Sequence, residues 1–183
     1  MQQALIFIVA TLSQLYLFVM LLRLWLPWLG GDFRNPIAQG ILRLTSPLVV
    51  PVRRLIPPIG RLDTATVLVA FGLQYLTILV ILLINGTMTG VMPIAITALL
   101  DLVILSCRLF TFAIIIHIVL SWIAPGTYNP ATALIASLVE PLLRPFRRIM
   151  PSLGGLDLSP IFAIILLQAL SIVLVNELRP LPI

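Results

Sequence analysis

The sequence predicts an all-α membrane protein in which four transmembrane helices form two tandem repeats. Each repeat is expected to carry an interfacial amphipathic helix and a Pro-Arg-Arg segment between its two spans. The composition indicates the class, because 61% of the 183 residues are hydrophobic, only 9% are charged and the mean hydropathy is +1.19. Soluble domains normally carry about 25% charged residues. The chain also holds apolar runs of the length that crosses a hydrocarbon core of about 30 Å.

The connection between the first two apolar runs is repeated between the last two. It reads PLVVPVRRLIPPIGRLD at positions 47–63 and PLLRPFRRIMPSLGGLD at positions 141–157, which are 94 positions apart with no gap. The same offset pairs Trp28 with Trp122 and Gln74 with Gln168. We therefore expect two repeats, at 1–89 and 95–183. The matching motif residues are Pro47 and Pro141, Pro51 and Pro145, Arg53-Arg54 and Arg147-Arg148, Pro57 and Pro151, Gly60 and Gly154, and Asp63 and Asp157.

Charge and cysteine content exclude several classes of function. All eleven basic residues are arginine and six residues are acidic, which gives a formal net charge of +5. In a membrane protein this excess points to orientation and anionic lipid rather than to nucleic acid. The single cysteine, Cys107, excludes an internal disulfide framework and a CxxC metal site. The chain has no HExxH or GxSxG motif, no paired mid-span aspartates and no Cys/His cluster. We expect no enzyme activity, no cofactor and no metal.

The first span is expected from Ala4 to Leu29, because no charge interrupts this run before Arg23. Trp25 and Trp28 fall where an aromatic belt at the membrane interface would lie. Arg23 has two interpretations. The favoured one is a guanidinium that snorkels to the head groups, and the other is a buried functional charge.

An amphipathic helix is expected after the first span. Ile37, Ile41 and Leu44 recur at helical spacing, which suits a short helix lying in the interface. The four prolines between positions 47 and 58 each remove a backbone donor. We expect them to prevent a regular continuation and to hold an extended backbone at the membrane surface. The corresponding helix of the second repeat is expected over Ala131 to Leu143.

The remaining spans are expected at about 64–85, 103–122 and 159–176, the third being counted back about 20 residues from its terminal tryptophan. The tail at 177–183 is expected to be a short exposed stub. Asp101 would then lie in the outer interface, and Arg108, seven residues later, would not form a direct ion pair with it unless the helix bends.

Two groups of polar residues within the spans leave alternatives open. His117 occupies the place of Arg23 in the repeat, either as an interfacial or hydrogen-bonded structural residue or as a proton relay. The in-span glutamines would make interhelical hydrogen bonds or line a polar pathway. They are Gln14, Gln74 and Gln168.

Orientation follows from the arginines. The two long connections, 30–62 and 125–156, lie on one side of the membrane because two spans separate them, and they hold eight of the arginines. Positive charge stays cytoplasmic. We expect these loops to face the cytoplasm and both termini to face the periplasm, in a multi-pass protein of the cell inner membrane.

The paired motif, placed in each repeat between two spans, resembles the YggT family of bacterial membrane proteins in its two-copy proteobacterial form. The first copy departs from the second at Thr66, where the second has Pro160. The resemblance implies a link to osmotic-shock tolerance, and to cell-envelope, division or plastid membrane biogenesis. It implies no catalytic residues.

The twin arginines of the two motifs are the candidate binding residues. Arg53, Arg54, Arg147 and Arg148 would face lipid phosphates, to which a surface arginine contributes about 1 kcal/mol of attraction. Topology alone, lipid or partner docking, and ion handling all stay open for them. Gly60 and Gly154 would permit the turn, while Asp63 and Asp157 would cap the next helix or pair with the arginines. The expected partners are anionic head groups and other membrane, division or envelope proteins, and an oligomer is allowed.

The expected function is a non-enzymatic organiser of membrane or envelope components. The alternative is a small oligomeric channel or transporter for ions or osmolytes.

Overall fold

The computed structural model describes residues 1–60, 62–87, 89–123, 129–149 and 157–181. Helices account for almost all of these residues, and no named strand occurs among them. Their bounds are α1 Gln2–Leu29, α2 Pro36–Leu55, α3 Thr64–Asn85, α4 Val91–Ile123, α5 Pro130–Ile149, α6 Ser159–Val173 and the π-helical turn η1 Leu174–Leu178.

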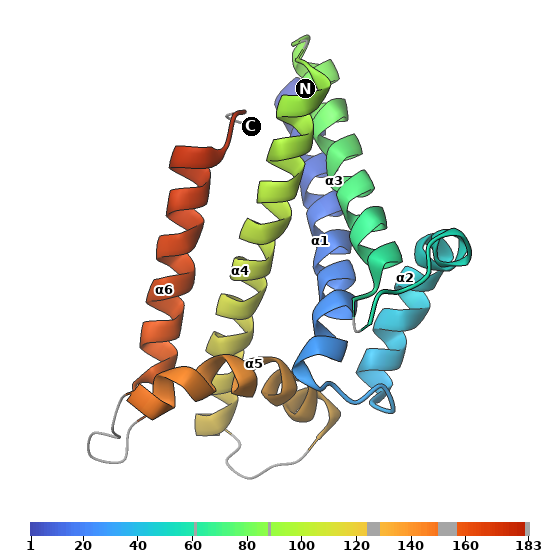
Figure 1. Ribbon diagram of the computed structural model, residues 1–183. Helices are drawn as coiled ribbons and strands as arrows, with labels where there is room; N and C mark the ends of the chain where they lie inside the picture. The colour runs from blue at the N-terminus through green and yellow to red at the C-terminus, as the bar shows by residue number, and fades with distance from the viewer. Residues whose placement is uncertain (61, 88, 124–128, 150–156, 182–183) are drawn as a thin grey trace.

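Four helices are long and apolar enough to cross a membrane: α1, α3, α4, and α6 continued by η1. Figure 1 shows their axes roughly side by side, with successive spans running in opposite directions, both chain termini at one end of the molecule and α5 lying across the other end. α2 flanks α1 and α3 in the half of the molecule away from the termini (Figure 1). The all-helical class and the four candidate spans that the sequence predicts are therefore confirmed.

The third spanning helix is longer than predicted. The sequence placed its start near Val103, but α4 begins at Val91 and has 33 residues. Counting back about 20 residues from the terminal tryptophan assumed that the helix is only as long as the membrane is thick. Pro93 is the third residue of α4, where its missing N–H has no helical acceptor to serve, so the proline starts the helix instead of breaking it.

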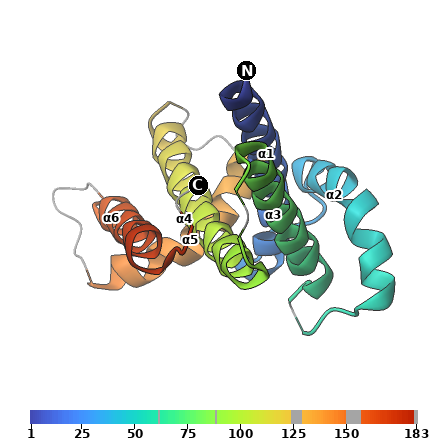
Figure 2. The same ribbon diagram turned by 90° about the horizontal axis from the view of Figure 1, so that it is seen from above.

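The prolines of the motif do not end the interfacial helices, which corrects the predicted extended backbone. α2 continues through Pro47 and Pro51, and α5 continues through Pro141 and Pro145. A proline inside a helix removes one hydrogen bond and clashes with the preceding turn, which bends the helix. Both prolines of α2 are exposed, so the freed carbonyls are not sealed in the protein core. Figure 2 shows the resulting bend of α2.

Asparagine caps start both interfacial helices. Asn35 Oδ1 accepts a hydrogen bond from the Ile37 amide at 2.9 Å, and Asn129 Oδ1 accepts one from the Thr132 amide at 2.9 Å. In each repeat a proline follows the asparagine, at a position where its fixed φ favours the helix. Each Asn-Pro dipeptide therefore starts an interfacial helix.

The core lies between the spans of each repeat and where the repeats meet. In the first repeat, buried leucines of α1 pack against Ala65 and Ala70 of α3, and Val49 of α2 closes this cluster. In the second, Ala113 and Ala163 are buried where α4 meets α6. Small residues allow helix backbones to approach closely, which is how helices associate in lipid.

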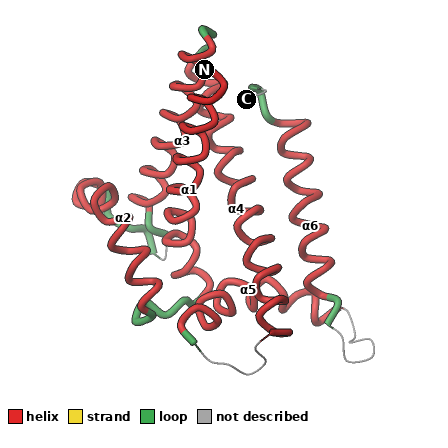
Figure 3. The backbone as a smooth tube through the Cα atoms, turned by 180° about the vertical axis from the view of Figure 1, so that it is seen from behind, coloured by secondary structure: helices red, strands yellow, loops and turns green. Residues whose placement is uncertain are grey.

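Residues near the end of α1 contribute two of the contacts that join the repeats. Leu26 of α1 and buried residues of α2 pack against Leu134 and Leu138 of α5. Trp25 of α1 packs edge-on against Phe110 of α4 with ring centroids 5.2 Å apart, and its indole N–H donates to Ser106 Oγ at 3.2 Å. Trp25 thus connects α1 to α4, and its place in an aromatic belt at the interface stays a prediction. Figure 3 shows α4 between the first repeat and α6.

Candidate functional site: two arginine motifs and a polar cavity

The first motif places an arginine and an aspartate at the junction of α2 and α3. Arg53, in the last turn of α2, donates from Nη2 to Asp63 Oδ2 at 3.0 Å. Asp63 is the N-cap of α3 and also accepts from the Thr66 hydroxyl at 2.8 Å. The predicted alternatives for Asp63, helix capping and arginine pairing, are both present. Arg54 is exposed.

Arg23 belongs to the same cluster. Its side chain is only 4% exposed, Nη1 donates to Thr45 Oγ1 at 2.8 Å, and Nε lies 3.6 Å from Asp63 Oδ2. The favoured interpretation, a guanidinium snorkelling to the head groups, is therefore wrong, and the arginine is buried in the protein. The sequence did not reveal its partner because Asp63 is forty positions away and reaches it only through the path of α2.

The second motif builds a related cluster at the junction of α5 and α6. Arg147 donates from Nε to Asp157 Oδ2 at 2.7 Å and from Nη1 to Glu140 Oε2 at 2.6 Å. Asp157 also accepts from the Ser159 amide at 2.9 Å. Arg148 is exposed, and Pro151 and Gly154 lie outside the described residues.

Electrostatics favour the charged forms in the second cluster. Partial burial lowers the pKa of Arg147, but its hydrogen bonds with Asp157 and Glu140 outweigh burial and leave the pKa raised. For Asp157, burial raises the pKa, but the hydrogen bonds from Ser159 and Arg147 leave it lowered.

His117 has a titratable neighbour that the sequence did not reveal. Its Nε2 lies 3.9 Å from Glu140 Oε1 of α5. The prediction considered only helical spacing along one helix and therefore missed an acid from another. The contact places His117 beside the second motif, at the end of α4 that meets α5 (Figure 1).

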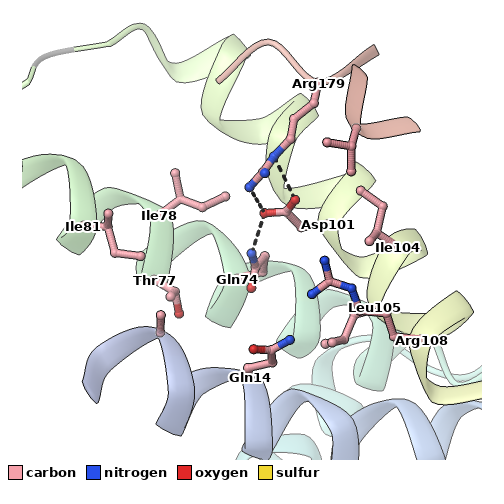
Figure 4. A pocket seen from close by; sticks show the side chains of 12 residues that line it. Gln14, Gln74, Thr77, Ile78, Ile81, Asp101, Ile104, Leu105, Arg108 and Arg179 are labelled. Atoms are coloured by element: carbon pink, nitrogen blue, oxygen red, sulfur yellow. Dashed lines mark hydrogen bonds and ion pairs between the residues drawn. The ribbon is translucent and has the colours of Figure 1, made fainter. Parts of the chain in front are cut away.

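A polar cavity of about 240 Å³ lies between α1, α3, α4 and the residues that follow α6. Figure 4 shows Gln14, Gln74, Asp101, Arg108 and Arg179 around it. Such residues are costly in a hydrocarbon environment, so their convergence marks a candidate site.

Asp101 is the centre of this cavity's hydrogen bonding. Gln74 Nε2 donates to its Oδ2 at 2.9 Å, and Arg179 pairs with it at 3.1 Å. The interhelical hydrogen bond predicted for Gln74 is confirmed. The predicted exposed stub is wrong for Arg179, whose side chain is 18% exposed, because η1 directs the tail back onto α4. Gln168 is exposed and does not line the cavity.

The geometry defines a class, a multi-pass helical protein with charged clusters at the ends of its spans and a polar cavity among them. Comparison with known proteins gives the family: the chain belongs to the CCB3/YggT family, whose model matches residues 2–84 and 96–178. The two matched ranges are offset by the same 94 positions as the motif, which indicates the tandem repeat. The resemblance stated from the motifs is thus confirmed.

Similar proteins come from several bacteria and a plant. "Uncharacterized protein PA0392" of Pseudomonas aeruginosa is 42% identical, covering 96% of this chain and 90% of that protein. "Uncharacterized protein YggT" of Escherichia coli K12 is 34% identical, covering 90% of this chain and 86% of that protein. "YlmG homolog protein 2, chloroplastic" of Arabidopsis thaliana is 37% identical over 34% of this chain and 24% of that protein. No solved structure matches the chain.

Proposed function

We propose that this protein is a non-enzymatic organiser of the bacterial inner membrane, which holds anionic lipid and envelope proteins against its two arginine motifs. In this proposal the motifs face the cytoplasm, the termini face the periplasm, and the organising role supports tolerance of osmotic shock. The family membership and the excess of arginine in the two long connections support this arrangement.

One observation carries the proposal. Both repeats fix the first arginine of the pair to an aspartate, at 3.0 Å for Arg53 and 2.7 Å for Arg147. Both leave the second arginine, Arg54 or Arg148, exposed. Orientation alone would not require a repeated ion pair at this junction. A fixed arginine followed by a free one is an arrangement suited to phosphate or carboxylate groups at the surface.

The test uses the exposed arginines, because Arg147 and Arg53 also hold the structure together. Arg54→Gln with Arg148→Gln is expected to lower binding of anionic lipid about thirtyfold, since each arginine contributes about 1 kcal/mol. Lipid retained by the purified protein measures the first effect. Photo-crosslinking from Leu55, which is exposed next to Arg54, measures recruitment of neighbouring proteins.

The control is a topology measurement on the same variant. Single cysteines in the two loops and at the termini, labelled from outside the cell, are expected to keep their accessibility. An inverted variant, or one with unchanged lipid retention and unchanged cross-links, would mean that these arginines serve orientation only.

The polar cavity favours a second candidate, a small channel or transporter. Its glutamines, Asp101 and two arginines could replace the hydration of a small polar solute inside the membrane. Flux through liposomes that contain the purified protein tests this. Sustained flux abolished by Asp101→Asn or Gln74→Leu would place transport above organisation, and Gln168→Leu is the matched control outside the cavity.

A further inference from the structure

We propose that the first repeat binds the phosphate group of an anionic lipid in a cavity beside Arg23, and that the second repeat carries a carboxylate of its own, Glu140, in place of that phosphate. This inference rests on the proposed function, because it names the ligand and the place at which one repeat would hold it.

The repeat offset identifies the corresponding residues of the two clusters. Arg53 corresponds to Arg147 and Asp63 to Asp157, and these pairs make the same ion pair in both repeats. Two positions differ in charge. They are Arg23, which corresponds to His117, and Ser46, which corresponds to Glu140.

Position 46 decides the charge balance. In the second cluster Glu140 accepts from Arg147 at 2.6 Å and lies 3.9 Å from His117. In the first cluster Ser46 lies at the same place, with Oγ 3.4 Å from Arg23 Nη1, but it brings no charge. The first cluster therefore sets two arginines against one carboxylate. The second sets one arginine and a histidine against two carboxylates.

One of the two guanidinium groups of the first cluster is buried. Arg23 is 4% exposed, and its Nε atom is buried and has no hydrogen-bond partner among the described residues. The single carboxylate, Asp63, is shared between Arg23 and Arg53. A buried guanidinium whose charge and donors are not fully satisfied is costly, so a second anion at this place would be stabilising.

A cavity of about 600 Å³ adjoins these groups. Its lining includes Arg23, Arg53, Asp63, Phe33 and Leu42. Arg23 lies at the buried part, while Arg53, with 46% of its side chain exposed, can meet a ligand from outside. Guanidinium groups bind phosphate oxygens through paired N–H donors, so these two arginines could hold a phosphate group in the cavity.

The cavity wall favours a lipid over free phosphate. Phe33, Leu42 and Pro27 line it beside the arginines, so charged and apolar surfaces meet in one cavity. Ile59, between the lining residues Pro58 and Gly60, is largely exposed and would face acyl chains. An anionic phospholipid presents the matching combination of phosphate and hydrocarbon.

The experiment counts the lipids that stay bound to the full-length protein after release from detergent, by native mass spectrometry with phosphatidylglycerol or phosphatidylcholine added. The wild-type protein is expected to retain one phosphatidylglycerol in this cavity, in addition to lipid held by the exposed arginines Arg54 and Arg148. Ser46→Glu supplies the missing carboxylate internally and should reduce that retention about tenfold, the effect of losing a charge-assisted hydrogen bond. His117→Arg with Glu140→Ser gives the second repeat the charge balance of the first and should retain one phosphatidylglycerol more than the wild-type protein.

The inference would be overturned if Ser46→Glu retained as much phosphatidylglycerol as the wild-type protein. It would also be overturned if the wild-type protein retained phosphatidylcholine as well as it retains phosphatidylglycerol. Stabilisation by inorganic phosphate as large as that by phosphatidylglycerol would exclude the lipid as the occupant. If Ser46→Glu does not fold, Ser46→Asp supplies the carboxylate on a shorter side chain and provides the same comparison. The two proposals can fail separately. If lipid retention is unchanged in Ser46→Glu but lipid binding and cross-links still depend on Arg54 and Arg148, this site is overturned and the proposed function stands.

Discussion

The removal of one charge from each arginine cluster should have very different consequences in the two repeats. Asp63 has 9% of its side chain exposed and is shared by Arg23 and Arg53. Asp63→Asn keeps an oxygen that can cap α3 but leaves Arg23 buried beside no anion. Removal of one partner of a buried ion pair destabilises by about 3–5 kcal/mol. We expect a loss of this size in the free energy of unfolding.

Asp157→Asn is the matched control. Asp157 occupies the same place in the second repeat, but 42% of its side chain is exposed, as is 38% of that of Arg147. Exposed ion pairs contribute about 0–1 kcal/mol. Asparagine is an equally good helix cap, so the capping contribution is nearly unchanged in both variants. The two substitutions should therefore differ by about 2–5 kcal/mol.

The assay is reversible unfolding in mixed micelles, with the fraction of denaturing detergent raised and the fluorescence of the three tryptophans recorded. Arg23→Met added to Asp63→Asn should recover part of the loss, because an apolar side chain then replaces the unpaired charge. Equal losses for the two aspartates, or no recovery in the double variant, would refute the assignment of Arg23 as a buried charge that depends on Asp63.

Three further outcomes are expected. The pKa of Asp157 is lowered in the folded protein, so its contribution to stability should be complete above the ordinary pKa of about 3.9 and should be lost as pH falls through the lowered value. Unfolding measured as a function of pH should show this step, and Asp157→Asn should remove it. Pro51→Ala should straighten α2, so that spin labels at the end of α2 and the start of α3 move apart, while an unchanged distance would mean that the prolines do not set the bend. Arg179→Ala should remove the ion pair that holds the tail to Asp101 and lower the unfolding midpoint in micelles, whereas an unchanged midpoint would show that the tail is not anchored there.

The sequence predicted the parts of the fold that depend on local hydrophobicity and on repetition. Four spans, the helical class and the two copies followed from apolar runs and from an offset that needed no gap. Helix ends near prolines were predicted less well. Pro47 and Pro51 were predicted to prevent a regular helix, but they lie inside α2, at exposed positions where the helix bends.

The pairing of charges could not be predicted from the sequence, because the partners come from different helices. Arg23 meets Asp63 only after α2 has turned back, and Arg179 meets Asp101 only because η1 directs the tail onto α4. Periodicity along one helix contains no information about either contact. The comparison of the two repeats did contain a usable signal. His117 corresponds to Arg23 and Glu140 corresponds to Ser46, and these two differences together change the charge of one cluster.

The residues that the two copies share and those in which they differ have different physical roles. Shared prolines bend the interfacial helix, and the shared Arg–Asp ion pair ties its end to the next span, at 3.0 Å in one repeat and 2.7 Å in the other. These interactions shape the backbone, so a change in either copy would disturb the junction itself. Position 46 and its counterpart, Glu140, change only the charge presented inside that junction. Divergence at such a position can alter what a repeat binds while the bundle is preserved, so we expect the first repeat, and not the second, to take up an anion inside this junction.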